Sequence, residues 1–139
     1  MKRFASAHWE GTGKEGHGSL TSQSTVLNNT QYSFLSRFAD GVGTNPEELI
    51  AAAHAGCFTM KLSFELNAAG YTADSLDTKA VVNLDTAAGA INEIELTLTA
   101  KVPGLTEDKF QELAAKAKAE CPISRLFTAN ITLSATLEA

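Results

Sequence analysis

The stretch GTNPEELIAAAHAGCF, Gly43–Phe58, most constrains how this chain of 139 residues can fold. Asn45 can cap a helix, Pro46 fits the first helical position, and Glu48 follows at the third, where it completes a capping-box arrangement. Gly70 is the matching stop signal. The sequence therefore predicts a long helix with defined ends.

This helix, expected over Asn45–Ala68, carries one of the two cysteines of the chain. Its apolar residues at helical spacing are Ile50, Ala53, Cys57, Met60 and Phe64. Small residues elsewhere on the helix allow close neighbours, which indicates a central helix covered by protein on several sides. Cys57 is then either an inert core thiol or a reactive one.

Alternating polar and apolar residues predict strands on both sides of the helix. The expected strands are Arg3–Glu10, Gly18–Thr25, Gln31–Phe38, Thr78–Leu84 and Ile94–Val102. Thr106 should cap a second helix, which Glu120–Cys121–Pro122 ends, and Ile131–Leu137 should form a closing strand. Antiparallel strand groups with two main helices predict an α+β fold, in a single domain over residues 1–139.

Composition narrows the class of protein. The net charge is −5, and 44% of the residues are hydrophobic, as in an ordinary soluble globular protein. We expect no nucleic-acid partner, since no basic stripe is present, and no membrane span. No export signal follows the first residues, so we expect a cytoplasmic protein. In the reducing cytoplasm we expect the two cysteines to be buried, catalytic or redox-active, and not to form a permanent structural disulfide.

The surroundings of each thiol decide its reactivity, because only the thiolate attacks. Pro122 places Cys121 at or beside a helix N-cap, where free N–H groups would lower the pKa of its thiol. Alternatively, Cys121 lies at a break in the chain and only fills space there. Burial would raise the pKa of Cys57, so a reactive Cys57 needs a nearby base or positive charge. The candidates are His54, Lys61, Arg37 and Arg125.

Four motifs resemble the OsmC/Ohr family of thiol-dependent organic hydroperoxide reductases. They are TNPEELIAAAHAGCF at Thr44–Phe58, AHWEG at Ala7–Gly11, SRF at Ser36–Phe38 and ECPIS at Glu120–Ser124. The likeness extends over essentially the whole chain. AHWEG and AAAHAGCF resemble the OsmC branch of the family.

The resemblance implies an OsmC-like α+β fold, with antiparallel sheets around a long central helix that carries Cys57. It also implies an intertwined homodimer with two active sites at the subunit interface. It implies that Cys57 attacks the peroxide, that Cys121 resolves the product as a disulfide, and that Arg37 and Glu47 are the conserved charged pair. His54 and Lys61 then take supporting or structural roles. No cofactor or metal is implied, and the expected reductant is an external dithiol of the lipoyl type.

Helix geometry adds a constraint to this assignment. Glu47 lies ten residues before Cys57, about 15 Å along an undistorted helix. If Arg37 pairs with Glu47 and also contacts a Cys57 thiolate, the groups belong to different chains or the helix bends. Apolar surroundings favour an alkyl or fatty-acid hydroperoxide over hydrogen peroxide. The candidate pocket walls are Phe34, Phe38, Phe58, Met60 and Leu126.

Three other functions remain as alternatives. Cys57 and His54 could form a nucleophile–base pair for acyl transfer, although an orienting acid and an oxyanion hole are not evident. Metal binding by the cysteines with His8, His17 or His54 lacks a close ligand cluster. A non-catalytic small-molecule-binding or stress-related protein of the same fold is the main rival to the enzyme.

Overall fold

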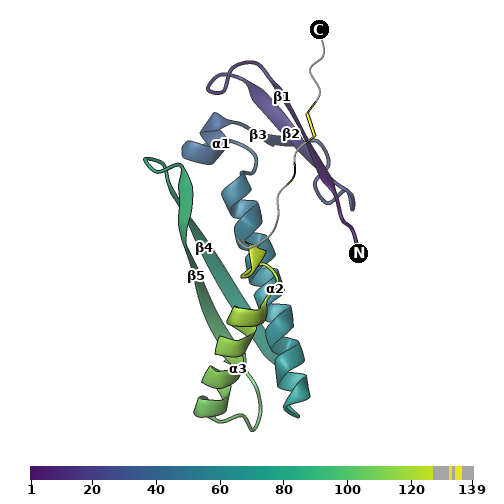
Figure 1. Cartoon of the computed structure of the whole chain (residues 1–139), viewed down its shortest axis with the longest axis vertical. Coiled ribbons are helices and arrows are strands. Elements are labelled where there is room, and N and C mark those ends of the chain that lie inside the picture. The colour runs from purple at the N-terminus through teal and green to yellow at the C-terminus, as the bar shows by residue number, and fades with distance from the viewer. Residues whose placement is uncertain (127–131, 133, 136–139) are drawn as a thin grey trace. The chain divides into compact units, whose positions relative to one another are not determined.

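The computed structural model describes residues 1–126, 132 and 134–135 (Figure 1). The elements in chain order are β1 (Ala5–Glu10), β2 (His17–Ser22), β3 (Thr30–Tyr32), α1 (Phe34–Phe38), α2 (Pro46–Ala68), β4 (Ser75–Asp85), β5 (Ala90–Lys101) and α3 (Glu107–Glu120). They form two compact units. The first comprises Met1–Ala52 and Val81–Glu95, and the second Ala53–Ala80 and the described residues from Leu96 onward.

The first unit contains a three-stranded antiparallel sheet in the order β1-β2-β3. Gly18 is required where β2 passes Trp9 and Tyr32, because a Cβ there would come within 2.6 Å of each ring. The two rings pack edge to face with centroids 5.3 Å apart. The first two expected strands are confirmed with slightly different ends.

The expected strand Gln31–Phe38 is wrong beyond Tyr32, since Phe34–Phe38 forms helix α1. Ser33 and Ser36 make a reciprocal capping box: each side chain accepts a hydrogen bond from the other's backbone N–H, at 3.2 and 2.8 Å. This cap outweighs the strand preference of the aromatic residues around it, because it provides partners for backbone donors that a helix start leaves free.

Helix α2 begins and ends where the sequence predicts. The side chain of Asn45 accepts a hydrogen bond from the N–H of Glu48 at 2.8 Å, and the Glu48 carboxylate accepts one from the Thr44 hydroxyl at 3.3 Å. At the other end Gly70 has a φ of +90°, and the N–H of Tyr71 bonds the carbonyl of Leu66 at 2.9 Å.

The buried face of α2 differs from the predicted stripe. The buried residues are His54, Phe58, Leu62, Glu65 and Leu66, whereas Met60 and Phe64 are 64% and 63% exposed. Apolar residues lie on more than one side of α2, so their spacing does not tell which side the rest of the chain covers. In the second unit the covered side is the one that packs against α3.

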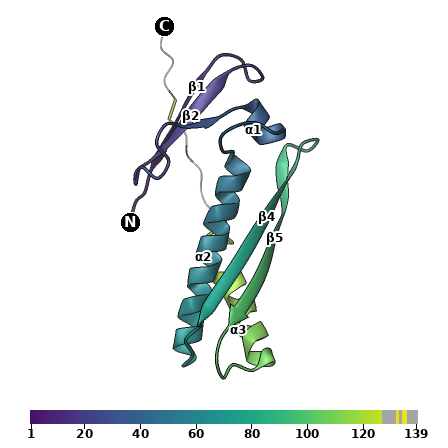
Figure 2. The ribbon, with the colours of Figure 1, turned by 180° about the vertical axis from the view of Figure 1, so that it is seen from behind.

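Strands β4 and β5 form a two-stranded sheet whose four-residue connection makes it antiparallel, as Figure 2 shows. Ile94, Leu96, Leu98 and Ala100 are partly buried, and the residues between them are exposed. This is the predicted alternation, and β4 shows the same pattern from Leu76 to Leu84. The α+β class with antiparallel sheets is thus confirmed.

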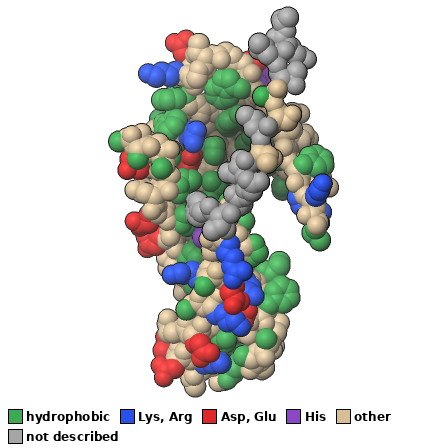
Figure 3. Space-filling model, viewed as in Figure 1, with side chains coloured by type: hydrophobic (Ala, Val, Ile, Leu, Met, Phe, Trp, Pro, Cys, Tyr) green, Lys and Arg blue, Asp and Glu red, His purple; other side chains and the backbone are tan. Residues whose placement is uncertain are grey.

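Helix α3 begins at the predicted cap, where the Thr106 side chain accepts a hydrogen bond from the N–H of Lys109. It ends at Glu120, with Cys121 as C-cap. The core of the second unit consists of Phe58, Leu62, Leu66, Leu113, Ala117 and Cys121. Basic and acidic side chains are intermixed over α3 (Figure 3).

The expected closing strand Ile131–Leu137 lies mostly outside the described residues. Within the part of the chain that the structure describes, none of the helices has the length and hydropathy to cross a membrane.

Candidate active site: a thiol pair and an arginine–glutamate pair

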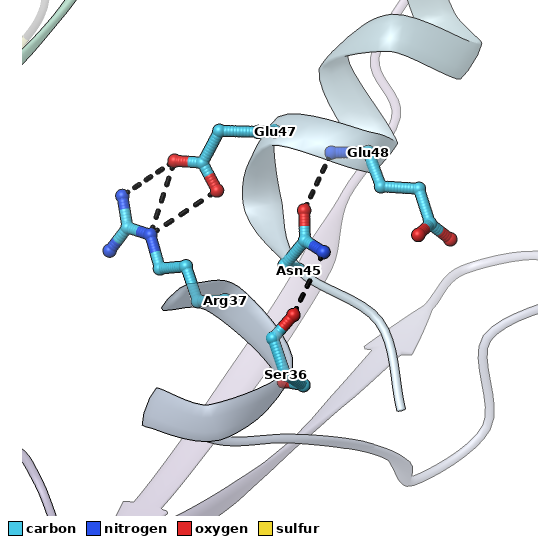
Figure 4. Close-up of polar contacts among 5 residues, drawn as sticks. All are labelled: Ser36, Arg37, Asn45, Glu47 and Glu48. Atoms are coloured by element: carbon cyan, nitrogen blue, oxygen red, sulfur yellow. Dashed lines mark hydrogen bonds and ion pairs between the residues drawn. The ribbon is translucent and has the colours of Figure 1, made fainter. Parts of the chain in front are cut away.

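Two side-chain contacts join α1 to the start of α2 and so determine where Arg37 lies. The Ser36 hydroxyl donates to the carbonyl of Thr44 at 2.8 Å. The Asn45 amide donates to the carbonyl of Ser36 at 3.0 Å (Figure 4). Asn45 thus caps α2 with its oxygen and holds α1 with its nitrogen. Arg37, the next residue along α1, is brought beside the first turn of α2.

The Arg37 guanidinium meets the Glu47 carboxylate there, as the sequence predicts. Its Nη2 donates to Oε1 at 2.7 Å, and its Nε lies 3.1 and 3.2 Å from the two carboxylate oxygens (Figure 4). The Glu47 side chain is 13% exposed and that of Arg37 39%. Such forked, charge-assisted bonds hold a guanidinium in one orientation, and the remaining N–H groups can take another anion.

The two cysteines meet in the second unit, although 64 positions separate them in the sequence. Cys57 lies in the middle of α2 and Cys121 at the end of α3, and their sulfur atoms are 2.8 Å apart as free thiols in hydrogen-bond contact. A disulfide bond is about 2.05 Å long, so a small movement would suffice to join them.

The pKa values of the two thiols change in opposite directions. Burial, and then the hydrogen bond with Cys121, raises the pKa of Cys57. Burial alone would raise the pKa of Cys121 as well, but the hydrogen bond shared with Cys57 and the backbone of Ser124 and Ile123 lower it. Cys121 is the C-cap of α3, and the described residues after Pro122 form a hydrogen-bonded turn and not the predicted helix start.

The family model described as OsmC-like protein matches residues 39–136. This chain belongs to the OsmC family. Peroxiredoxin OsmC of Escherichia coli (strain K12) is 48% identical over 134 residues, which cover 95% of this chain and 94% of that protein. An organic hydroperoxide resistance protein of Xanthomonas axonopodis pv. citri is 34% identical over 105 residues, 71% of this chain and 70% of the relative.

Solved structures agree with this membership. The crystal structure of the organic hydroperoxide resistance protein OhrB of Bacillus subtilis matches with a TM-score of 0.61 at 28% identity, covering 91% of this chain and 92% of that one. The OsmC-like fold expected from the four motifs is thus confirmed.

The four predicted site residues of this OsmC-family protein form two pairs. Arg37 and Glu47 belong to the first compact unit, and Cys57 and Cys121 to the second. Among the residues that the structure describes, no group of three or more His, Cys, Asp or Glu side chains could hold a metal ion.

The other candidate partners of Cys57 have contacts of their own. Lys61 pairs with Glu65 at 2.7 Å and with Glu120 at 3.3 Å. The Nε of Arg125 donates to the carbonyl of Ala119 at 3.3 Å. Lys61 therefore belongs to an ion-pair network between α2 and α3.

His54 has a contact that the sequence reasoning missed. Its Nε2 lies 2.9 Å from the hydroxyl of Ser124, 70 positions away. Ser124 is the last residue of the ECPIS motif. No local pattern in the sequence points to this contact, because the two residues lie 70 positions apart.

The candidate pocket walls are divided between the units. Phe34 and Phe38 pack against each other in the first, with ring centroids 4.8 Å apart. In the second, Phe58 is 4% exposed and belongs to the core, whereas Met60 and Leu126 are exposed. Phe58 therefore has the core role that burial of such residues usually indicates.

Proposed function

We propose that this OsmC-family protein, a peroxidase-like enzyme, reduces organic hydroperoxides to alcohols with Cys57 as the attacking thiol. The contact between the Cys57 and Cys121 sulfur atoms carries the proposal, because a sulfenic acid formed on one needs the other within reach. The names of the curated relatives, peroxiredoxin and organic hydroperoxide resistance protein, support the same chemistry and substrate class.

The first step is attack of the Cys57 thiolate on the terminal oxygen of the hydroperoxide. An S–O bond forms, the O–O bond breaks, and the alkoxide takes up a proton and leaves as the alcohol. Burial raises the pKa of Cys57, so this step needs a positive charge that stabilises the thiolate. Arg37, oriented by Glu47, supplies that charge and stabilises the developing alkoxide.

In the second step the thiol of Cys121 displaces the oxygen of the sulfenic acid as water, and a disulfide between Cys57 and Cys121 forms. An external dithiol of the lipoyl type then reduces this bond by thiol–disulfide exchange. The cycle uses no cofactor.

The protein acts as a cytoplasmic homodimer of a single-domain chain. Glu47 and Cys57 lie on one continuous helix about ten residues, or roughly 15 Å, apart, so one guanidinium does not readily serve both within a chain. A site that combines Arg37 and Glu47 of one subunit with the thiols of the other removes this difficulty. A monomeric form with full activity would contradict it.

The test is turnover of cumene hydroperoxide with a dithiol reductant by the wild-type protein, Cys57→Ser and Cys121→Ser. We expect Cys57→Ser to be inactive. Cys121→Ser should consume about one equivalent of peroxide and then stop, because its sulfenic acid lacks a resolving thiol. A wild-type protein without turnover would instead support a non-catalytic binding protein. Two free thiols after one equivalent of peroxide would exclude the resolving role of Cys121.

A further inference from the structure

Two polar contacts lie on either side of the thiol pair along α2, and we refer to them as the flanking contacts. One turn before Cys57, the Nε2 of His54 lies 2.9 Å from the hydroxyl of Ser124. One turn after Cys57, the Nζ of Lys61 lies 3.3 Å from a carboxylate oxygen of Glu120. All of these residues belong to the second compact unit.

The flanking contacts and the sulfur contact have the order of two antiparallel segments that lie side by side. Read from the start of α2, the partners in the other segment come in the order Ser124, Cys121 and Glu120. The segment from Glu120 to Ser124 therefore lies along α2, with the sulfur contact between two polar contacts.

The contact at Ser124 is shielded from water. His54 is 6% exposed, and burial lowers the pKa of its ring, so at neutral pH this is a hydrogen bond between neutral groups. A hydrogen bond away from water is costly to break, because the group that is left behind loses its partner without gaining a water molecule.

The contact at Glu120 belongs to a network of four charges. Lys61 also pairs with Glu65 at 2.7 Å, and Glu65 pairs with Lys116 of α3 at 2.8 Å. The side chain of Glu65 is 9% exposed, whereas that of Glu120 is 37% exposed. Glu65 holds the ammonium group of Lys61 in place, so the pair with Glu120 costs less side-chain freedom than an isolated surface pair.

These contacts act where α3 ends. The helix ends at Glu120, and Cys121 is tied to it by the hydrogen bond from its N–H to the carbonyl of Ala117 at 3.0 Å. After Cys121 the chain leaves the helix in a turn, in which the N–H of Arg125 bonds the carbonyl of Pro122 at 3.2 Å. The flanking contacts restrain both sides of this junction against α2.

We infer that Glu120 and Ser124, with Lys61 and His54 as their partners, are positioning residues that keep the Cys121 sulfur beside Cys57. The role depends on the proposed peroxidase cycle, whose disulfide step it serves. Contacts that order the segment before the S–S bond forms raise the effective concentration of one thiol at the other. Without them, part of this ordering has to take place when the disulfide forms.

The direct test is the equilibrium of the thiol pair with dithiothreitol, which needs no peroxide. Cys57 and Cys121 give two electrons and two protons to oxidised dithiothreitol, so their S–S bond forms and the S–S bond of dithiothreitol breaks. We expect the equilibrium constant for disulfide formation to fall about threefold in Glu120→Gln and about fivefold in Ser124→Ala. Unchanged constants in both variants overturn the inference.

Each substitution has a matched control. Glu112→Gln removes the same charge from α3, and Glu112 pairs with Lys109 of its own helix, so this variant should keep the wild-type equilibrium constant. Ser124→Thr keeps a hydroxyl and should regain most of what Ser124→Ala loses. Circular dichroism and the melting temperature show that each variant is folded. An equal fall in Glu112→Gln and Glu120→Gln would assign the effect to net charge and contradict the inference.

The consequence for the cycle is measured by trapping the Cys57 sulfenic acid with dimedone, in competition with Cys121. At one equivalent of cumene hydroperoxide, Glu120→Gln and Ser124→Ala should increase the trapped fraction about threefold. The rate at which Cys57 is oxidised should not change. Slower oxidation with unchanged trapping would place these residues in the first step and refute the positioning role.

The two proposals fail in different ways. If Cys57 and Cys121 form no disulfide with either oxidised dithiothreitol or peroxide, the resolving step of the proposed function is wrong. If the disulfide forms with the same equilibrium constant in the wild type, Glu120→Gln and Ser124→Ala, only the positioning role is wrong.

Discussion

Glu47 is the residue on which the orientation of Arg37 depends. Replacing it by Gln keeps the shape and removes the charge that makes the forked bonds strong. We expect Glu47→Gln to slow oxidation of Cys57 by an organic hydroperoxide about tenfold, because a guanidinium that moves stabilises a developing charge poorly. The rate is measured by loss of the reactive thiol in single-turnover experiments.

Glu48 provides the matched control for this substitution. It is the next residue of the same helical turn, and its carboxylate bonds the Thr44 hydroxyl and not Arg37. Glu48→Gln should change the same rate less than twofold. If the two variants lose activity equally, the effect comes from helix charge and the orienting role of Glu47 is wrong.

At the scale of elements, Glu65 joins α2 to α3. Its carboxylate pairs with Lys61 at 2.7 Å on its own helix and with Lys116 at 2.8 Å on α3. Hydrogen bonds from Lys116 and then Lys61 hold the pKa of Glu65 below its ordinary value. A lowered carboxyl pKa means that this stabilisation is complete above the ordinary glutamate pKa and is lost as the pH falls through the folded-state value.

We therefore expect the melting temperature of the wild-type protein to fall more steeply between about pH 5 and pH 3 than that of Glu65→Gln. The variant should be the less stable protein at neutral pH, since it removes the carboxylate that Lys61 and Lys116 share and leaves Lys61 with Glu120 alone. Glu112→Gln is the control, because Glu112 pairs with Lys109 on the exposed face of α3. Its pH profile should follow that of the wild type. Parallel profiles for Glu65→Gln and the wild type would contradict the prediction.

At the scale of the whole molecule, the exposed apolar residues of α2 bear on the proposed homodimer. Met60 and Phe64 are one turn apart and largely exposed in this chain. Two large apolar side chains exposed one turn apart on a helix are candidates for a surface that a second subunit covers. We expect the wild-type protein to sediment as a dimer and Phe64→Glu as a monomer with little peroxidase activity.

Gln111→Glu adds the same charge on an exposed position of α3 and should remain dimeric and active. Sedimentation velocity measures the assembly, and the cumene hydroperoxide assay measures the activity. A Phe64→Glu monomer with full activity would show that the site does not need a second subunit.

Most elements were predictable, because the signals that start and end them act over a few residues. Asn45, Thr106 and Gly70 act through backbone groups within one helical turn, and the alternation in β5 reflects one buried and one exposed face. A local signal also explains why the strand predicted over Phe34–Phe38 is wrong. Two serines three residues apart form a helix cap there, inside a segment rich in aromatic residues.

The motifs also identified Cys57, Cys121, Arg37 and Glu47 as candidates, and the structure pairs them as Arg37 with Glu47 and Cys57 with Cys121. The sequence by itself thus determined where most of the described helices and strands lie, which family the chain resembles and which residues are candidates to react. Only the tertiary structure decided that α2 buries the side with Phe58 and Leu62, and that the His54 ring reaches Ser124. These choices depend on which surfaces pack together across 64 and 70 positions of the chain, and no local pattern of residues encodes that.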